Sequence, residues 1–204
     1  MLRLTLLSSL IERKRTMPAA TSMPTRASLR SIAIGVLMAL GFSGAALAAP
    51  EVGGTYYTQY NLWTEKGKVN TTNYSRGELV PFNSKAKLVS LGEKKFVIES
   101  DGRSLQIVNK PKHTQRGASQ IADELLKPNK VSLSGVNNDL RSDMRNGILR
   151  LGMTKAQTIA TRGYPPRHKT PSTEANRWIY WSSRFVQLTL VFENGRLSQG
   201  RGLY

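Results

Sequence analysis

The sequence predicts an α+β protein made of two small modules behind a secretory leader. Three observations support this class: strand-like alternation early in residues 49–204, short capped helices after it, and three more strand patterns near the end. We expect a small β-sheet or SH3-like barrel, followed by a two-helix, three-stranded antiparallel module. The expected boundaries are 1–48 for the leader, 49–116 for the β-rich module, 117–136 for a helical connector and 137–204 for the C-terminal module.

The leader combines two arginines, an uncharged apolar run over residues 32–47, and small residues before Ala49. Arg26 and Arg30 precede the run, and Ala46 and Ala48 end it. This order is typical of a secretory signal, so we expect cleavage after Ala48 and a periplasmic or secreted protein without a stable transmembrane span. The alternative is an uncleaved anchor, although the run is short for a span and contains three glycines. A start at Met23 would give a leader of ordinary length.

Strand signals fill residues 55–109. "TYYTQYNLW" is rich in aromatic residues and threonine, "KAKLVSL" alternates, and "KKFVIESDGRSLQIVN" contains Asp101-Gly102 between two strand patterns, a strong hairpin signal. Alternation places Phe96 and Ile98 on one face of this hairpin, with Leu105 and Ile107 opposite them.

Three short helices are expected next. "SQIADELL" ends before Pro128, and "NNDLRSDMRNG" begins with amide residues and ends at Gly147. The third helix has the clearest signals: Thr154 is placed to cap it, Gln157 completes a capping box, and Gly163 follows its end.

"RWIYWSS", "RFVQLTLVFE" and "GRLSQGR" predict three strands, the last two joined at Asn194-Gly195. In the first, alternation sends Trp178 and Tyr180 to one face and Ile179 and Trp181 to the other. The sheet therefore has apolar residues on both faces. The helices can cover one face, and either the N-terminal strands or a partner protein should cover part of the other.

One series of residues resembles a known family. In order stand Gly152-Met153-Thr154, Gln157, Gly163, Pro165, Trp178-x-Tyr180 and Phe192-x-x-Gly195-x-Leu197. This series is similar to the SmpA/OmlA family, the small lipoprotein of the outer-membrane protein assembly machine and its relatives, over about residues 137–200. The resemblance implies two helices on a three-stranded antiparallel sheet and a role near cell-envelope assembly. The chain departs from the family in two ways: it lacks the lipid-bearing cysteine, and its helix carries Thr158, Thr161 and Arg162 where the family commonly has apolar residues.

The stretch "GYPPRHKTPSTEANRWIYW", residues 163–181, looks most like a site. In a catalytic interpretation His168 is a general base, with Ser172 or Glu174 as its partner. The stretch is equally typical of a stiff, proline-rich surface connector, which we favour because the chain lacks hydrolase, metalloprotease and phosphate-loop motifs. With two histidines and no cysteine, we expect no catalytic, cofactor-binding or metal-binding residues.

Charge indicates an anionic partner. Residues 49–204 carry 24 Lys and Arg against 12 Asp and Glu, a formal net charge of +12, and the cations after residue 135 are mostly arginine. Export makes nucleic acid a poor candidate, which leaves an envelope protein or an anionic envelope component. A solvated surface that serves only solubility is the alternative. The candidate partner-binding residues are Arg162, Arg167, His168, Lys169, Arg177, Trp181, Arg184 and Phe185.

We therefore expect a non-catalytic protein of the bacterial envelope that acts in binding or scaffolding. Two alternatives stay open. One is a small hydrolase of an envelope polymer that uses Glu65 and Glu78 or the His168 loop. The other is an inhibitor or ligand-binding protein that presents the Trp181 face. A deep pocket with paired carboxylates would favour the enzyme, and an open apolar or arginine-lined surface would favour binding.

Overall fold

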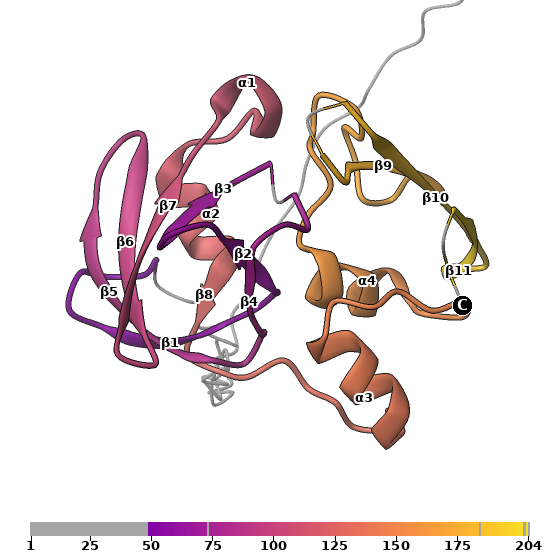
Figure 1. The fold of residues 1–204 in the computed structure, drawn as a ribbon, viewed down its shortest axis with the longest axis horizontal. Coiled ribbons are helices and arrows are strands. Elements are labelled where there is room, and N and C mark those ends of the chain that lie inside the picture. Colours follow the sequence, from indigo (N-terminus) through magenta and orange to yellow (C-terminus); the bar gives the residue numbers. More distant parts are fainter. Residues whose placement is uncertain (1–48, 73, 184, 202, 204) are drawn as a thin grey trace, which may run out of the picture. The chain divides into compact units, whose positions relative to one another are not determined.

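The computed structural model describes residues 49–72, 74–183, 185–201 and 203 (Figure 1). The fold is α+β, as predicted, with more strand than helix. The leader expected over residues 1–48 lies outside the described residues. Within the described ranges, no helix has both the length and the apolar character that a membrane crossing requires.

The N-terminal module is built on a six-stranded mixed sheet. Its strand order is β3-β7-β6-β5-β1-β8, and β3 pairs with β7 in parallel. Strands β2 and β4 form a separate antiparallel pair. The pairing confirms a small β-rich module but does not confirm an SH3-like barrel. The strands are β1 (Thr55–Thr58), β2 (Leu62–Thr64), β3 (Lys68–Asn70), β4 (Glu78–Val80), β5 (Lys85–Leu91), β6 (Lys95–Ser100), β7 (Arg103–Val108) and β8 (Leu126–Lys127).

The hairpin between β6 and β7 forms as predicted. Asp101 and Gly102 both have positive φ, at 51° and 70°, which is the backbone that a tight hairpin turn requires. The four apolar side chains expected to meet across the hairpin are paired and buried: Phe96 with Ile107, and Ile98 with Leu105.

The segment 117–136, expected as a helical connector, contributes to the N-terminal core. Helix α2 (Ala118–Leu125) buries Ile121, Ala122 and Leu125 in the same cluster as the sheet, and β8 directly after it pairs with β1. Helix α1 (Pro111–Thr114), a single turn between β7 and α2, was not predicted.

Helices α3 (Asn138–Arg145) and α4 (Lys155–Arg162) begin at the predicted caps. The side chain of Asn137 accepts the Leu140 N–H at 2.8 Å. At α4, Thr154 Oγ1 accepts the Gln157 N–H at 3.2 Å and Gln157 Oε1 accepts the Thr154 N–H at 2.8 Å, a complete capping box. Gly163 follows with φ of 77°, a conformation that ends the helix without strain.

The C-terminal sheet has three antiparallel strands in the order β11-β10-β9 (Figure 1). Its inner face packs Trp178, Tyr180, Leu190 and Phe192 with residues of α3 and α4, and all four are buried. The predicted alternation is therefore confirmed. The strands are β9 (Arg177–Trp181), β10 (Gln187–Glu193) and β11 (Arg196–Gly200).

The polar residues of α4 that depart from the family pattern are all buried, and each is accommodated. The Thr158 and Thr161 hydroxyls donate to the carbonyls of Thr154 and Gln157, at 3.0 and 2.7 Å, so their methyl groups can pack in the interior. The guanidinium of Arg162 lies over the Trp63 ring, 5.2 Å from its centroid.

Asn61 joins the two modules from the interior. Its Nδ2 donates to the carbonyls of Met144 (2.7 Å) and Thr161 (3.0 Å), and its Oδ1 accepts the Phe82 N–H at 2.8 Å. Its own N–H donates to the Ala160 carbonyl at 3.0 Å. Because Asn61 is completely buried, it holds α3 and α4 to the N-terminal module without contact with solvent.

Candidate functional site

The proline-rich connector, residues 163–176, contacts the free edge of β9. Pro165 and Pro166 are buried, and Thr170 Oγ1 accepts the Ile179 N–H at 2.9 Å. Because a strand N–H points along the plane of the sheet, this contact places Thr170 at the free edge of β9. On the second face, for which the sequence left the N-terminal strands or a partner as the options, His168 of the connector lies against Trp181.

Three rings meet where the connector turns. The His168 ring is parallel to the Trp181 ring, with centroids 6.4 Å apart and planes 9° apart. On its other side, His168 contacts His113 of α1, with ring centroids 4.7 Å apart at an angle of 63°. We call His113, His168 and Trp181 the histidine–tryptophan stack. His113 and His168, which are 55 residues apart in the sequence, join α1 to the connector, and Trp181 of β9 extends the stack.

Some polar atoms of the stack lack hydrogen-bond partners in the described part of the chain. The His168 N–H and Nδ1 both lie 3.2 Å from the His113 carbonyl oxygen. His113 Nδ1 and the Trp181 indole N–H are buried, and neither has a hydrogen-bond partner among the described residues. Burial, together with His168, Lys112 and Lys110, lowers the pKa of His113.

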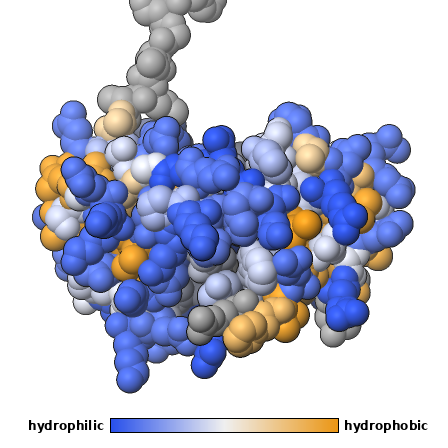
Figure 2. Space-filling view, turned by 90° about the horizontal axis from the view of Figure 1, so that it is seen from above, coloured by the Kyte–Doolittle hydropathy of each residue, from blue (hydrophilic) through white to orange (hydrophobic). Residues whose placement is uncertain are grey.

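Exposed cations surround the stack. Lys110 and Lys112 flank His113 on α1 and are near enough to lower its pKa, while Arg167 and Lys169 flank His168. Within the described ranges, none of these four cations forms an ion pair. We call Lys110, Lys112, Arg167 and Lys169 the basic rim. Figure 2 looks onto the side of the molecule where α1 lies in Figure 1, and this side is mostly hydrophilic with small hydrophobic areas.

An apolar tip adjoins the stack at the turn between β9 and β10. Trp181 pairs with Gln187, and the turn between them is closed by the Ser182 N–H, which donates to the Val186 carbonyl at 2.8 Å. In this turn Phe185 is 85% exposed and Val186 is 50% exposed. These two residues form the apolar tip.

Of the eight candidate partner-binding residues, the structure stacks His168 on Trp181, and Arg167 and Lys169 adjoin His168 in the chain. Phe185 lies in the turn that directly follows Trp181. Arg177 is exposed on the same face of β9 but lies four residues from Trp181, about 13 Å along the strand. Arg162 is buried, so it is not available for a partner contact as the sequence suggested. Arg184 lies outside the described residues.

Sequence reasoning missed three members of this surface, Lys110, Lys112 and His113, all from α1 or its cap. Their signal was present in "NKPKHTQR", where two lysines flank the only other histidine of the chain. What the sequence did not indicate is that this short helix packs beside the connector. That contact is nonlocal, and no periodicity encodes it.

In the described residues, His168 makes no hydrogen bond to Ser172 or Glu174, the partners that the catalytic interpretation requires. Its ring nitrogen bonds to a backbone carbonyl, and the Ser172 hydroxyl accepts the Glu174 N–H at 3.1 Å instead of contacting the histidine. In the parts of the chain that the structure describes, no group of three or more His, Cys, Asp or Glu side chains is placed to hold a metal ion.

Glu65 and Glu78, the alternative catalytic pair, are both exposed, and each pairs with an arginine. Arg76 Nε lies 3.1 Å from Glu65 Oε1, and Arg103 Nη1 lies 2.9 Å from Glu78 Oε2. The small cavity beside Glu65 has a volume of about 10 Å³. That is room for no more than one water, so it does not form a substrate pocket.

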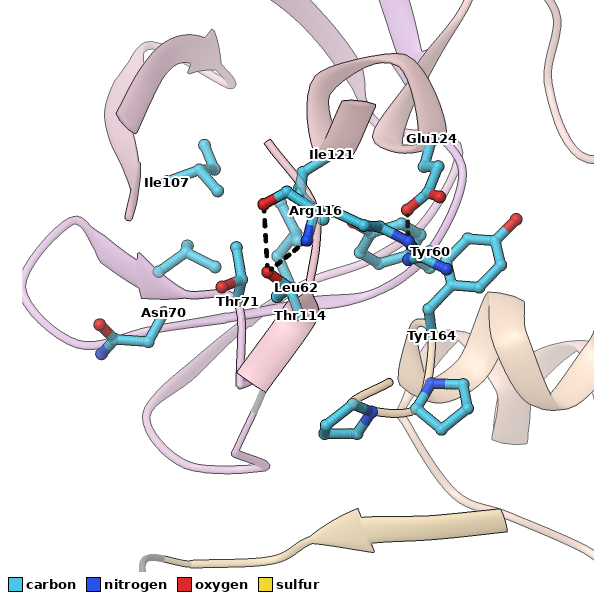
Figure 3. A pocket seen from close by; sticks show the side chains of 13 residues that line it. Tyr60, Leu62, Asn70, Thr71, Ile107, Thr114, Arg116, Ile121, Glu124 and Tyr164 are labelled. Atoms are coloured by element: carbon cyan, nitrogen blue, oxygen red, sulfur yellow. Dashed lines mark hydrogen bonds and ion pairs between the residues drawn. The ribbon is translucent and has the colours of Figure 1, made fainter. Parts of the chain in front are cut away.

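A second cluster lies at the junction of the modules (Figure 3). Arg116 reaches across the Tyr164 ring, 5.0 Å from its centroid, to Glu124, with Nη1 2.6 Å from Oε2. Tyr60 meets Tyr164 edge to face at 6.0 Å. Burial raises the pKa of Glu124, although Arg116 opposes the change. The cavity here holds about 30 Å³, space for one or two waters, so the cluster packs a junction rather than a ligand.

Two open grooves flank α2, with volumes of about 420 and 410 Å³, and both are lined by Asp123 and Glu124. These neighbours on a helix do not face each other as a catalytic pair would. Each is also held by a cation: Lys127 Nζ lies 2.7 Å from Asp123, and Arg116 holds Glu124. The grooves therefore offer no free carboxylate pair.

Comparisons of the chain with protein-family models, with curated proteins and with solved structures found no match. The stack, its basic rim and the apolar tip are therefore the features of this chain that bear on its function.

Proposed function

We propose that this protein is a non-catalytic binding or scaffolding protein that docks an acidic segment of another envelope protein. The observation that carries the proposal is the surface made of the histidine–tryptophan stack, the basic rim and the apolar tip. It combines unpaired, exposed cations with an exposed phenylalanine. Such a combination suits a partner that has carboxylates beside an apolar side chain.

The cations of the rim are suited to association as well as to contact. An excess of positive charge steers an acidic partner and raises its association rate, while the apolar anchor determines how slowly it dissociates. Proline residues stiffen the connector that carries Arg167 and Lys169, so less conformational entropy is lost on docking.

The sequence supports the cellular location that we propose for the protein. The leader pattern supports export, and the SmpA/OmlA resemblance supports a place near outer-membrane or cell-envelope assembly. The arrangement of α3 and α4 with the three-stranded sheet agrees with the fold that the resemblance implies. We also propose that the N-terminal module is SH3-like. Its role in the docking surface is to hold α1 beside the connector.

Site-specific photocrosslinking in living cells tests the proposal. A photoreactive phenylalanine analogue at Phe185 should give one dominant adduct with an acidic envelope protein, because this side chain is 85% exposed beside the basic rim. Val89 of β5 is the matched control, since it is also an exposed apolar residue (45%) but belongs to the other module.

A Lys112→Glu and Lys169→Glu double variant should abolish the Phe185 adduct without changing the amount of folded protein, since both lysines are exposed. Equal adducts at Phe185 and Val89, or an adduct at Phe185 that survives both charge reversals, would refute docking at this surface.

A further inference from the structure

The only two histidines of the chain contact each other at the centre of the proposed docking surface. They come from segments far apart in the sequence, and their contact is one of the links between α1 and the connector. Two neutral imidazoles at a ring separation of 4.7 Å are compatible, whereas two imidazolium rings repel each other. Their charge state therefore matters for this surface more than for the rest of the fold.

We infer that the histidine pair makes docking dependent on pH: the surface binds an anionic partner more tightly in mildly acidic conditions than at neutral pH, with uptake of protons. This inference rests on the proposed function and adds its regulation. Protonation of His113 would raise the charge of the stack and its rim from four positive groups to five.

The direction follows from linkage. In the free protein, burial and the neighbouring cations lower the pKa of His113, so this ring is neutral near pH 7. A bound anion offsets the repulsion among the cations and favours the protonated ring. Because the complex then holds more protons than the free protein, its stability increases as the pH falls.

The charged groups described near the histidine pair are cations, with one exception. Lys110 and Lys112 face His113 from its own segment, and Arg167 and Lys169 flank His168 on the connector. The exception is Glu124 of α2, which is near enough to Arg167 that the arginine lowers its pKa. Burial raises the pKa of Glu124, so this carboxyl needs its own control.

Dextran sulfate is a suitable probe, because its sulfate groups keep their charge throughout the pH range of the experiment. Calorimetric titration of the purified protein at pH 7.5 and 5.5, in buffers of different ionisation enthalpy, gives the affinity and the number of protons taken up. We expect an increase in affinity of about tenfold or more between these pH values. The uptake of one proton on binding changes the affinity about tenfold for each pH unit over which that proton is taken up.

Three variants assign the effect. His113→Gln plus His168→Gln should bind with an affinity that is nearly independent of pH, and His113→Gln alone should lose part of the dependence if the double variant does not fold. Glu124→Gln should keep the ratio of affinities at the two pH values. Loss of that ratio in Glu124→Gln, or its persistence in the histidine variants, would overturn the inference.

The outcomes also separate this inference from the proposed function. Binding that is strong at both pH values and takes up no protons would refute the pH dependence but leave the docking surface in place. If native protein binds no probe at low salt at either pH, both the docking surface and its regulation are wrong.

Discussion

The two faces of the C-terminal sheet carry one tryptophan each, three residues apart on β9, and the two are used differently. Trp178, on the inner face, is fully buried, donates its indole N–H to the Ala175 carbonyl at 2.8 Å and packs on Phe192 at 4.5 Å. Trp181, on the outer face, is half-buried and stacks on a histidine, and its indole N–H has no hydrogen-bond partner among the described residues.

The difference separates stability from recognition. In the core, Asn61 and the α4 threonines have hydrogen-bond partners. On the outer face, donors and cations without partners remain next to an exposed phenylalanine. A buried donor without a hydrogen-bond partner, such as the Trp181 indole N–H, costs about 1 to 3 kcal/mol. We therefore expect substitutions on the inner face to affect folding and those on the outer face to affect binding.

Trp178→Ala should have the largest effect. Loss of a fully buried indole costs about 3 to 5 kcal/mol, which is enough to unfold a small protein of ordinary stability. Denaturant unfolding of the native protein and the variant measures the cost. A melting temperature close to that of the native protein would show that the inner face is not the core.

Asn61→Ala should be the next most damaging substitution. It leaves the Met144 and Thr161 carbonyls and the Phe82 N–H without this partner, at about 1 kcal/mol or more for each buried group. We expect a loss of about 3 kcal/mol in the free energy of unfolding. Asn138→Ala, at an exposed position of α3, is the control and should change it by about 0.5 kcal/mol or less. Equal losses in both variants would show that Asn61 does not join the modules.

Trp181→Ala should cost clearly less stability than Trp178→Ala. The loss of a half-buried ring and one stacked pair is worth about 1 to 2 kcal/mol. Its effect on binding should be larger, because His168 loses the ring on which it stacks. Unfolding curves and dextran sulfate titrations of the same two variants measure both effects. A Trp181→Ala variant that is as unstable as Trp178→Ala, with native affinity, would reverse the assignment of the two faces.

The smallest expected effect is the pH dependence of stability in the free protein. The folded-state pKa of His113 lies below its ordinary value of 6.5, so its contribution to stability is present above about pH 6.5 and is lost as the pH falls through the lowered pKa. Melting temperatures between pH 7.5 and 5 should therefore fall less in His113→Gln than in the native protein. An identical fall in both would mean that His113 titrates as it does in the unfolded chain.

Much of the local structure could be predicted from the sequence, because its signals lie within a few residues of one another. The capping box of Thr154 and Gln157, the two positive-φ turns and the faces of β9 are of this kind. The burial of Arg162 was missed because the Trp63 ring that accommodates it lies about one hundred residues earlier in the sequence. Helix α1 is too short for periodicity to indicate it.

The same limit applied to the candidate site. The proline-rich connector, Trp181 and Phe185 stood out by residue type, and the structure brings most of the candidates near them together. The sequence pattern could not show that His113, from the other module, belongs to the site. It also could not show that Arg177, on the same face of β9 as Trp181, lies far from Trp181 along the strand. Contacts between distant segments depend on packing that a single sequence does not display.

The central claim is that position, and not total charge, makes the outer face a docking surface. Its most direct test compares two charge reversals of equal size by their affinity for dextran sulfate at low salt: Lys112→Glu plus Lys169→Glu on the basic rim, and Lys85→Glu plus Lys87→Glu on β5. Since a charge-assisted contact is worth about 1.5 to 3 kcal/mol and 1.4 kcal/mol is a factor of ten, we predict about a tenfold or greater loss for the rim variant. The β5 variant should stay within about twofold, the small change that a distant surface charge produces. Equal losses in the two variants would show that net charge alone drives binding, and would contradict the account.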